Sequence, residues 1–506
     1  PTPGKWYLRH VAFLGAQPPA VAGLKDMGFA AGDFAEALCF GQELPATDLQ
    51  PTSKEPPMSD ADKAELERLR AENQQLAAGK QAAEQAAEQA RADARKAQSE
   101  VKSYAEQAAA ERQAGFVAFA ETQIKAGRLL PRDKAVCVAA LQTLAAAWRR
   151  EVNPQVFGIT GSSGKTTVKE MLAAVLRAKF GADAVLATAG NFNNHIGLPL
   201  TLLNLRGHHR YAVIEMGMNH FGELAALTRI AAPDTALVNN AMRAHIGCGF
   251  NGVADIARAK SEIYQGLPEN GVALLPAEDA NLPVFQAACN GLKTLTFGAE
   301  HGDIHAENID LQPLSGTFDL VYGTERVRVS LPAAGRHNVA NACAAAALAV
   351  QAGVSLAEIA AGLATFGNIK GRLQQKRGIR NALILDDTYN ANPDSMKAAL
   401  DVLAKQPAPR VFVMGDMGEL GEAEAPKMHE EIGVYARELG IEYAYFVGDN
   451  SAQAAEKFGA AGLWFADKDP LILSLAHDLP ENASVLVKGS RFMRMEEVAD
   501  ALAETK

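Results

Sequence analysis

A glycine-rich segment between an apolar run and a helical pattern constrains the fold of this chain more than any other feature. Residues 156–168 read Val-Phe-Gly-Ile-Thr-Gly-Ser-Ser-Gly-Lys-Thr-Thr-Val. A strand that turns through glycines into a helix N-terminus points free backbone N–H groups and the positive helix end at one place, which suits the phosphates of a nucleotide. We therefore predict a phosphate-binding loop in which Lys165 reaches the outer phosphates and Thr166 ligates Mg²⁺.

The spacing of this loop departs by one residue from the strict motif G-x-x-x-x-G-K-[ST]. Gly158 comes one position early, and Ile159 stands where the leading glycine belongs. Because the strand, the later glycines and the following helix all agree, we favour nucleotide binding over an ordinary structural turn. The predicted contacts with the nucleotide are Gly161, Ser162, Ser163, Gly164, Lys165, Thr166 and Thr167.

The composition of the chain argues against some classes of function. A net charge of -10, without any basic block, argues against nucleic acid as the main ligand. No run of 18 apolar residues occurs, so we expect no membrane span. The five cysteines never form a C-x-x-C pair, which favours reduced thiols in a cytoplasmic protein. They are Cys39, Cys137, Cys248, Cys289 and Cys343.

The first part of the chain differs in composition from the rest. Residues 1–58 contain proline, glycine and short apolar pieces without a period, so we expect an irregular segment there. Residues 59–135 are rich in alanine and charged residues and predict helix, with a coiled-coil seam over 66–108. Because that seam is mostly alanine, we expect at most weak self-association through residues 59–113. A single solvated helix is an equally good interpretation.

From residue 139 onward, apolar strand-like runs alternate with helical stretches, which predicts an α/β fold with parallel sheets covered by helices. We expect a central ATP-binding domain with a mostly parallel sheet over 139–370 and a Rossmann-like C-terminal domain over 371–506. Residues 303–331 read as short antiparallel strands. Other strands are expected at 156–160, 211–216, 235–239, 271–275, 382–386, 410–414, 443–447 and 484–488, and helices at 115–133 and 135–150.

Three side chains beyond the loop are candidate metal ligands. Glu215 ends an apolar strand and so lies at the sheet edge where ligands bind, although a salt-bridged carboxylate is the competing interpretation. His245 follows the next strand, where a lone histidine is more often structural. Lys260 lies in a helical stretch after His245, and the two side chains converge on one ion only if the lysine loses its positive charge.

Further polar residues suggest how a nucleotide is held. Asn338 and Asn341 are three residues apart at a helix start, so their amides share one face and can read adenine, although asparagines there are more commonly caps. Arg372 offers a cation for a transferring phosphate. Asp387 begins a polar loop after a strand, which is again where ligands bind in α/β sheets.

Together and in this order, these residues resemble the Mur ligase family, which joins amino acids or peptides to a cell-wall precursor. The resemblance covers about residue 139 to the end and includes His245 and Lys260. Its other motifs are TGSSGKT (160–166), GNFNN (190–194), GLPLTLL (197–203), EMGMN (215–219), GRHN (335–338), GR (371–372), DTYNANP (387–393), GDMGELG (415–421) and VKGSR (487–491).

The resemblance implies an activity and its cofactors. The resemblance implies a ligase that adds D-alanyl-D-alanine to UDP-N-acetylmuramoyl-tripeptide in peptidoglycan synthesis. It uses ATP and Mg²⁺ and passes through an acyl phosphate, which an incoming amine then attacks. Such chemistry needs cations where phosphoryl oxygens crowd a carboxylate, and Lys165 and Arg372 match that need.

The resemblance also implies roles for individual residues. Thr166 and Glu215 look like ligands of one magnesium ion and His245 of a second. Lys260 lies where the family carries a carbamylated lysine, a modification that turns an ammonium group into a carboxylate-like ligand. The expected adenine contacts are Asn338 and Asn341, the ribose contact is Asp387, and the substrate contacts are Asn191, Asn193, Asn194, Asn390 and Asn392.

The front of the chain does not follow the family pattern. A complete ligase of this type begins with a domain that binds the uridine nucleotide, which we expect to be absent here. Residues 1 to about 135 instead resemble the scaffold portion of Mu-like prophage protease/scaffold proteins, with a junction between Lys134 and Leu141. Two alternatives stay open, a folylpolyglutamate synthase-like ligase and a scaffold–ligase fusion that binds ATP without turnover. The motifs at 389–393 and 415–421 weigh against the first.

Overall fold

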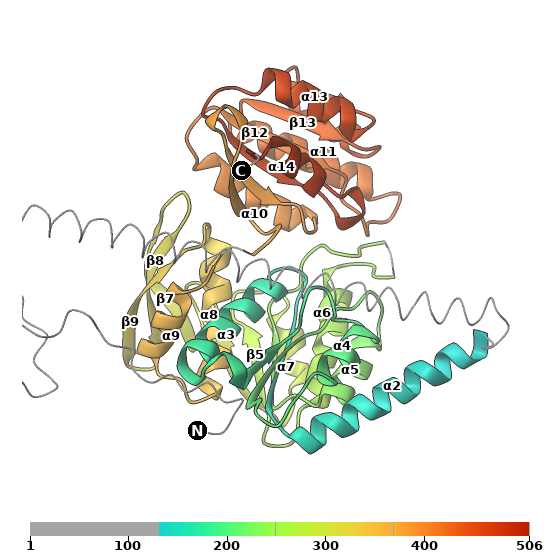
Figure 1. Ribbon diagram of the computed structural model, residues 1–506, viewed down its shortest axis with the longest axis vertical. Coiled ribbons are helices and arrows are strands. Elements are labelled where there is room, and N and C mark those ends of the chain that lie inside the picture. The colour runs from blue at the N-terminus through green and yellow to red at the C-terminus, as the bar shows by residue number, and fades with distance from the viewer. Residues whose placement is uncertain (1–130, 248, 368, 505–506) are drawn as a thin grey trace, which may run out of the picture. The chain divides into compact units, whose positions relative to one another are not determined.

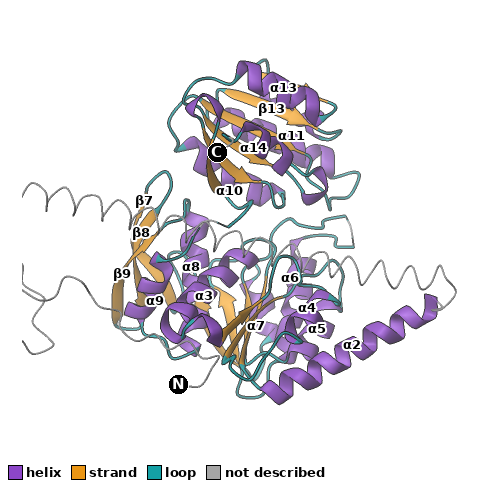
Figure 2. Cartoon of the chain, viewed as in Figure 1, coloured by secondary structure: helices purple, strands orange, loops and turns teal. Residues whose placement is uncertain are grey.

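The computed structural model describes residues 131–247, 249–367 and 369–504, which build two separate β-sheets (Figure 1). Figure 2 shows that helices cover the strands of each sheet. The expected irregular segment 1–58, the coiled-coil seam and the proposed self-association through residues 59–113 lie outside the described residues. They stay predictions.

The first sheet has nine strands in the order β2-β3-β1-β4-β5-β6-β7-β8-β9. Pairing is parallel from β2 to β7 and antiparallel from β7 to β9. The expected antiparallel patch over 303–331 is therefore confirmed, and it extends the main sheet. The strands are β1 (Gln155–Thr160), β2 (Val185–Ala187), β3 (Tyr211–Glu215), β4 (Thr235–Val238), β5 (Val272–Pro276), β6 (Lys293–Phe297), β7 (Ile304–Leu311), β8 (Gly316–Tyr322) and β9 (Glu325–Leu331).

Helices cover both faces of the first sheet because its strands are apolar on both sides. In β1, Phe157 and Ile159 face one core cluster and Val156 faces another. On the first face lie α3 (Lys165–Phe180), α8 (Arg336–Gln351) and α9 (Leu356–Ala364). On the second lie α2 (Pro131–Val152), α4 (Gly197–Leu202), α5 (Glu223–Ala231), α6 (Val253–Ser261) and α7 (Leu282–Ala288). Short 3₁₀ helices are η1 (Ala182–Ala184) and η2 (Glu262–Gly266).

The second sheet has six strands in the order β10-β11-β15-β12-β13-β14. Only the pair β10–β11 is antiparallel. The strands are β10 (Gln374–Arg377), β11 (Leu383–Asp387), β12 (Arg410–Gly415), β13 (Tyr443–Val447), β14 (Gly462–Phe465) and β15 (Ser484–Lys488). The helices are η3 (Ile379–Asn381), α10 (Pro393–Ala404), α11 (Ala425–Glu438), α12 (Ser451–Phe458), α13 (Lys468–Asp478), η4 (Arg491–Met493) and α14 (Glu496–Leu502).

The expected strands all exist, with ends that differ by at most one residue, but two expectations about elements were incomplete. The short strands β2, β6, β10 and β14 were not expected, because they are largely exposed or only partly buried and so do not form the buried apolar runs that marked the other short strands. The helix expected at 135–150 begins earlier, at Pro131, so residues 131–133 belong to α2 and not to a helix over 115–133. The predicted junction between Lys134 and Leu141 therefore lies inside one continuous helix.

No helix among the described residues is long and apolar enough to cross a membrane.

Gly362 lets α9 pack closely on α3, the helix that follows the phosphate loop. A Cβ atom at Gly362 would lie 2.5 Å from Cα of Val175, a backbone atom that cannot move aside alone. We expect Gly362→Ala to lower the free energy of unfolding by about 1–3 kcal/mol through overpacking. Thermal unfolding checks this against Gly207→Ala, whose Cβ would meet no heavy atom within 4 Å. Equal midpoints for the two variants would contradict the packing argument.

Candidate active site

We call the nine-stranded sheet with its helices (131–367) the first α/β part and the six-stranded sheet with its helices (369–504) the second. A cavity of about 2120 Å³ lies beside the carboxyl ends of β1, β3 and β4 and is lined by residues of both parts. Adjacent parallel strands bring the loops that follow them to one edge of a sheet. Gly161 and Lys260 are the two predicted site residues absent from the lining. The others line it: Ser162, Ser163, Gly164, Lys165, Thr166, Thr167, Asn191, Asn193, Asn194, Glu215, His245, Asn338, Asn341, Arg372, Asp387, Asn390 and Asn392.

The phosphate loop has the backbone geometry that its glycines predict. Gly164 precedes α3 with φ 79°, and a Cβ there would lie 2.4 Å from Oδ1 of Asn341. The loop is tied to the segment after β4, because Asn240 Oδ1 accepts from the Ser163 amide at 2.9 Å. Lys165 Nζ donates to the Gly161 carbonyl at 2.8 Å and so folds back over the loop. Glycine is required at position 164 both for its conformation and for its space.

Thr166 and Glu215 meet directly at the sheet edge. The Thr166 hydroxyl donates to Glu215 Oε2 at 2.9 Å, and Asn193 Nδ2 donates to Glu215 Oε1 at 2.8 Å. Burial alone would raise the pKa of Glu215, but Lys169, Lys165 and Arg372, together with the Asn193 hydrogen bond, outweigh burial and lower it. The carboxylate is therefore ionised at neutral pH, which is the state that Mg²⁺ prefers.

Arg372 points from the second α/β part toward the same place. Its Nη2 donates to the Thr166 hydroxyl at 2.8 Å, and its guanidinium lies 4.3 Å from the ring centre of Tyr389. Its buried Nε has no hydrogen-bond partner. A guanidinium held on an aromatic ring with a free buried donor suits a planar anionic group such as a phosphate.

His245 lies beside a carboxylate that was not predicted, and the charge of Lys260 acts on it. The His245 Nδ1 atom lies 3.4 Å from Oε2 of Glu419, which comes from the loop after β12. Burial, followed by the charges of Lys260, Lys165 and His220, lowers the pKa of His245 to about 4, so the imidazole is neutral at pH 7. A neutral imidazole is the form that binds metals.

Lys260 is almost fully buried, with 2% of its surface exposed. Burial, with a smaller contribution from the charge of Lys165, lowers its pKa well below the usual value, while Glu419 opposes that shift. The side chain is therefore poised to be a neutral amine. A neutral amine is a nucleophile, whereas an ammonium group is not.

Asn338 and Asn341 form a chain of amides at the start of α8. Asn341 Nδ2 donates to Asn338 Oδ1 at 3.1 Å, and Asn239 Nδ2 donates to Asn341 Oδ1 at 2.9 Å. Asn338 Nδ2 donates to the Ala334 carbonyl at 2.8 Å. Each predicted adenine contact still has one amide hydrogen and one lone pair to offer a ligand.

Asp387 ends β11 and is held from two sides. Its Oδ2 accepts from the buried Lys488 Nζ at 2.5 Å, and its Oδ1 accepts from the Leu373 amide at 3.1 Å. Lys488 also donates to the Asn390 carbonyl at 3.0 Å, so one ammonium group fixes the loop that carries Asp387 and Asn390.

Comparisons with known proteins agree with this geometry. The model of the Mur ligase middle domain matches residues 159–349, and that of the Mur ligase glutamate ligase domain matches residues 371–491. The UDP-N-acetylmuramoyl-tripeptide–D-alanyl-D-alanine ligase of Escherichia coli is 43% identical over 406 residues, which span 79% of this chain and 88% of that protein. The chain belongs to the Mur ligase family.

Solved structures show the same fold. The crystal structure of MurF from Acinetobacter baumannii matches with a TM-score of 0.68 at 40% identity, over 72% of this chain and 80% of that one. MurF from Thermotoga maritima, solved in complex with ADP, matches with a TM-score of 0.64 at 29% identity, over 72% and 83% of the two chains. The α/β fold predicted for 139–506 is thus a Mur ligase fold with a nine-stranded, mostly parallel sheet and a six-stranded mixed sheet.

Several asparagines predicted to contact substrate in this Mur ligase also have structural partners. Asn392 caps α10 by accepting from the Ser395 amide at 2.8 Å. Asn194 Oδ1 accepts from the amide of Gly197, the first residue of α4, at 2.9 Å. Asn191 and Asn390 also line the cavity. The hydrogen bonds that these two residues make use only their backbone carbonyls, which accept from the Asn193 amide and from Lys488 Nζ respectively. Substrate contact is a prediction for all of them.

Within the described residues, no three His, Cys, Asp or Glu side chains form a metal site by themselves. The two predicted sets of magnesium ligands are compatible with this absence, because one includes the Thr166 hydroxyl and the other a carbamylated Lys260, which are not among those four residue types. The pair Thr166 and Glu215 fits a hard cation, since both donors are oxygens 2.9 Å apart and the carboxylate is ionised.

Three residues of this Mur ligase site were missed as individual side chains, namely Tyr389, Glu419 and Lys488. Each lies in a motif that carried the family resemblance, in DTYNANP, GDMGELG and VKGSR. Their partners are distant in sequence, so no local spacing indicated them. For Glu419 and Lys488, a charged residue inside a glycine-containing strand end was the available signal.

Proposed function

We propose that this chain is an ATP-dependent ligase that adds D-alanyl-D-alanine to UDP-N-acetylmuramoyl-tripeptide in peptidoglycan precursor synthesis. The observation that carries the proposal is the convergence of Lys165, Glu215 and Arg372 on one cavity, in a chain that is 43% identical to a ligase of that name. ADP in the Thermotoga maritima structure supports ATP as the nucleotide.

The chemistry has two steps. A carboxylate oxygen of the tripeptide attacks the γ-phosphorus of ATP, and the bond from γ-phosphorus to the β–γ bridging oxygen breaks, giving an acyl phosphate and ADP. The amine of the dipeptide then attacks the acyl carbon, loses a proton and expels inorganic phosphate. Lys165 and Arg372 neutralise the charge that develops on the phosphoryl oxygens, and the backbone N–H groups at 161–166 hold the other phosphates.

Thr166 and Glu215 are the residues that would hold a magnesium ion, and His245 with Lys260 would hold a second. Such ions supply charge neutralisation at the phosphates. The second set requires Lys260 to be carbamylated, and the burial that lowers the pKa of its amine supports that requirement, since carbamylation joins an uncharged amine to carbon dioxide.

The nucleoside is placed by both α/β parts in this proposal. Asn338 and Asn341 read adenine with their remaining donors and acceptors, and Asp387 accepts from a ribose hydroxyl. Asn191, Asn193, Asn194, Asn390 and Asn392 contact the peptide substrates. The division into a central ATP-binding domain over 139–370 and a Rossmann-like domain over 371–506 is supported by the two separate sheets.

A phosphate-release assay on the full chain tests the function. We expect phosphate release only when ATP, Mg²⁺, D-alanyl-D-alanine and UDP-N-acetylmuramoyl-tripeptide are all present, with the pentapeptide product detected by mass spectrometry. Folate with glutamate serves as the comparison for the folylpolyglutamate synthase-like alternative. Turnover with folate and none with the dipeptide would reverse the assignment, and no turnover with either would favour the non-catalytic fusion.

A further inference from the structure

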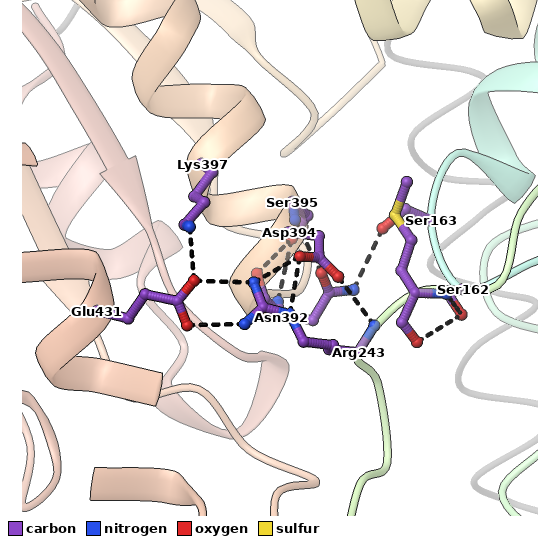
Figure 3. A network of polar contacts seen from close by, with 9 residues as sticks. Ser162, Ser163, Arg243, Asn392, Asp394, Ser395, Lys397 and Glu431 are labelled. Atoms are coloured by element: carbon purple, nitrogen blue, oxygen red, sulfur yellow. Dashed lines mark hydrogen bonds and ion pairs between the residues drawn. The ribbon is translucent and has the colours of Figure 1, made fainter. Parts of the chain in front are cut away.

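An ion-pair cluster joins the segment after β4 to two helices of the second α/β part (Figure 3). Arg243 donates from its backbone amide to Asp394 Oδ2 at 2.9 Å and from Nη2 to Asp394 Oδ1 at 2.6 Å. Its Nη1 donates to Glu431 Oε2 at 2.7 Å. Asp394 lies in the first turn of α10, and Glu431 lies in α11. We call Arg243, Asp394 and Glu431 the clamp.

The clamp adjoins the phosphate loop. Met242, the residue before Arg243, donates its amide to the Ser162 hydroxyl at 2.9 Å. Asn392, two residues before Asp394, donates from Nδ2 to the Ser163 hydroxyl at 3.2 Å. Figure 3 shows these serines beside the clamp. Arg243 is thus next to a residue whose amide donates to the phosphate loop, and Asp394 is two residues from an asparagine whose side chain donates to the same loop.

The contacts of the clamp are of the strong type. Arg243 donates to both carboxylates through several N–H groups. Charge-assisted ion pairs with several hydrogen bonds are stronger than ion pairs with a single hydrogen bond at the surface. The three side chains are only 27–33% exposed, so solvent screens them less than it screens a surface pair. Lys397 holds Glu431 from the other side at 2.5 Å and fixes its orientation.

We propose that Arg243 is a positioning residue that, through Asp394 and Glu431, holds the loop 387–392 and the first turn of α10 against the phosphate loop. The proposal rests on the ligase function, because that loop carries the expected ribose contact Asp387 and the expected dipeptide contacts Asn390 and Asn392. Arg243 touches no reacting atom and acts through the residues that it places.

This role predicts a particular kinetic signature. When the clamp is removed, the phosphate loop and the loop 387–392 lie together in a smaller fraction of molecules. The apparent affinity for a ligand that contacts both loops falls in proportion to that fraction. Bound ligand restores the assembled state at saturation. The KM for ATP therefore rises while kcat falls little. A merely unstable protein would lose kcat in proportion to its folded fraction at unchanged KM.

The experiment uses the full chain with Arg243→Ala, Asp394→Asn and the double variant. We expect each single variant to raise the KM for ATP about tenfold, which corresponds to about 1.4 kcal/mol, with kcat reduced less than about threefold. Because the two residues act as one pair, the double variant should be no worse than the single ones. Additive losses, or a fall in kcat at unchanged KM, would overturn the proposal.

Arg410→Ala is the matched control. Arg410 also binds a carboxylate in a bidentate manner, donating to Glu442 at 2.8 Å and 3.0 Å, but both residues belong to the second α/β part. Its side chain is 20% exposed and that of Glu442 is 35% exposed, close to the values for the clamp. We expect this variant to leave the KM for ATP unchanged, and an equal rise in that KM would overturn the clamp's special role.

Hydrogen exchange separates failure of the clamp from failure of the proposed function. Without substrates, Arg243→Ala should raise amide exchange at both 241–245 and 392–396 at least about tenfold, and Arg410→Ala should not. Unchanged exchange at these segments would overturn the clamp even if the chain is a working ligase. If the wild-type chain showed no ligase turnover, raised exchange would leave the clamp standing as a contact while its kinetic role and the proposed function fell.

Discussion

Lys165→Ala should reduce phosphate release by at least about 1000-fold, equivalent to about 4 kcal/mol of transition-state stabilisation. The ammonium group lies over the loop, 2.8 Å from the Gly161 carbonyl, where the outer phosphates of ATP would arrive. Burial lowers its pKa, although Glu215 and Glu419 oppose that shift. An alanine leaves the same loop backbone without the cation, so ground-state binding should suffer less than turnover.

Steady-state phosphate release, measured up to saturating ATP, distinguishes these effects. Lys179→Ala is a suitable control, because Lys179 also lies in α3 but pairs with Glu358 at the surface. It should leave kcat unchanged. If Lys165→Ala kept wild-type turnover at saturation, the loop would not be where phosphoryl transfer takes place.

The sequence predicted those parts of the site that depend on local order. Asn338 and Asn341 were expected to share a helix face because they are three residues apart, and their side chains are hydrogen-bonded to each other. Glu215 was expected beside the phosphate loop because it ends a buried strand, and it accepts from Thr166. In both cases the period of a helix or the end of a strand sets the position of the side chain.

The parts that were missed depend on tertiary contacts between distant segments. Arg243 and Asp394 are 151 residues apart, and neither belongs to a pattern that a helix or strand period reveals. Glu419 in the loop after β12 faces His245 in the loop after β4, and both residues have left-handed backbones, with φ values of 60° and 63°. Such strained conformations persist only where surrounding contacts hold them, here the bond from the Gly421 amide to the Ile246 carbonyl at 2.7 Å.

Three polar side chains of the candidate site, those of Thr166, Glu215 and Arg372, are arranged next to one another. Hydrogen bonds join these side chains to one another. Such pre-organisation lowers the cost of arranging charges when phosphate arrives. It also means that removal of one member leaves its neighbours with unpaired buried charges, so losses within this group should not add.

Lys260→Ala should reduce kcat by at least about 100-fold, with partial recovery when acetate or propionate is added. The buried amine, whose pKa lies well below its usual value, is suited to capture carbon dioxide, and the resulting carbamate would turn Lys260 into a carboxylate-like ligand. Truncation removes that group and leaves room for a small carboxylate.

Lys260→Arg is the matched control, since it fills the space, cannot form the carbamate and should not be rescued. A carbamate carbon signal in ¹³C NMR of the wild-type chain with labelled bicarbonate, absent from Lys260→Ala, gives a readout independent of activity. Unchanged kinetics for Lys260→Ala would exclude this lysine from the metal site and leave its burial as a packing feature of α6.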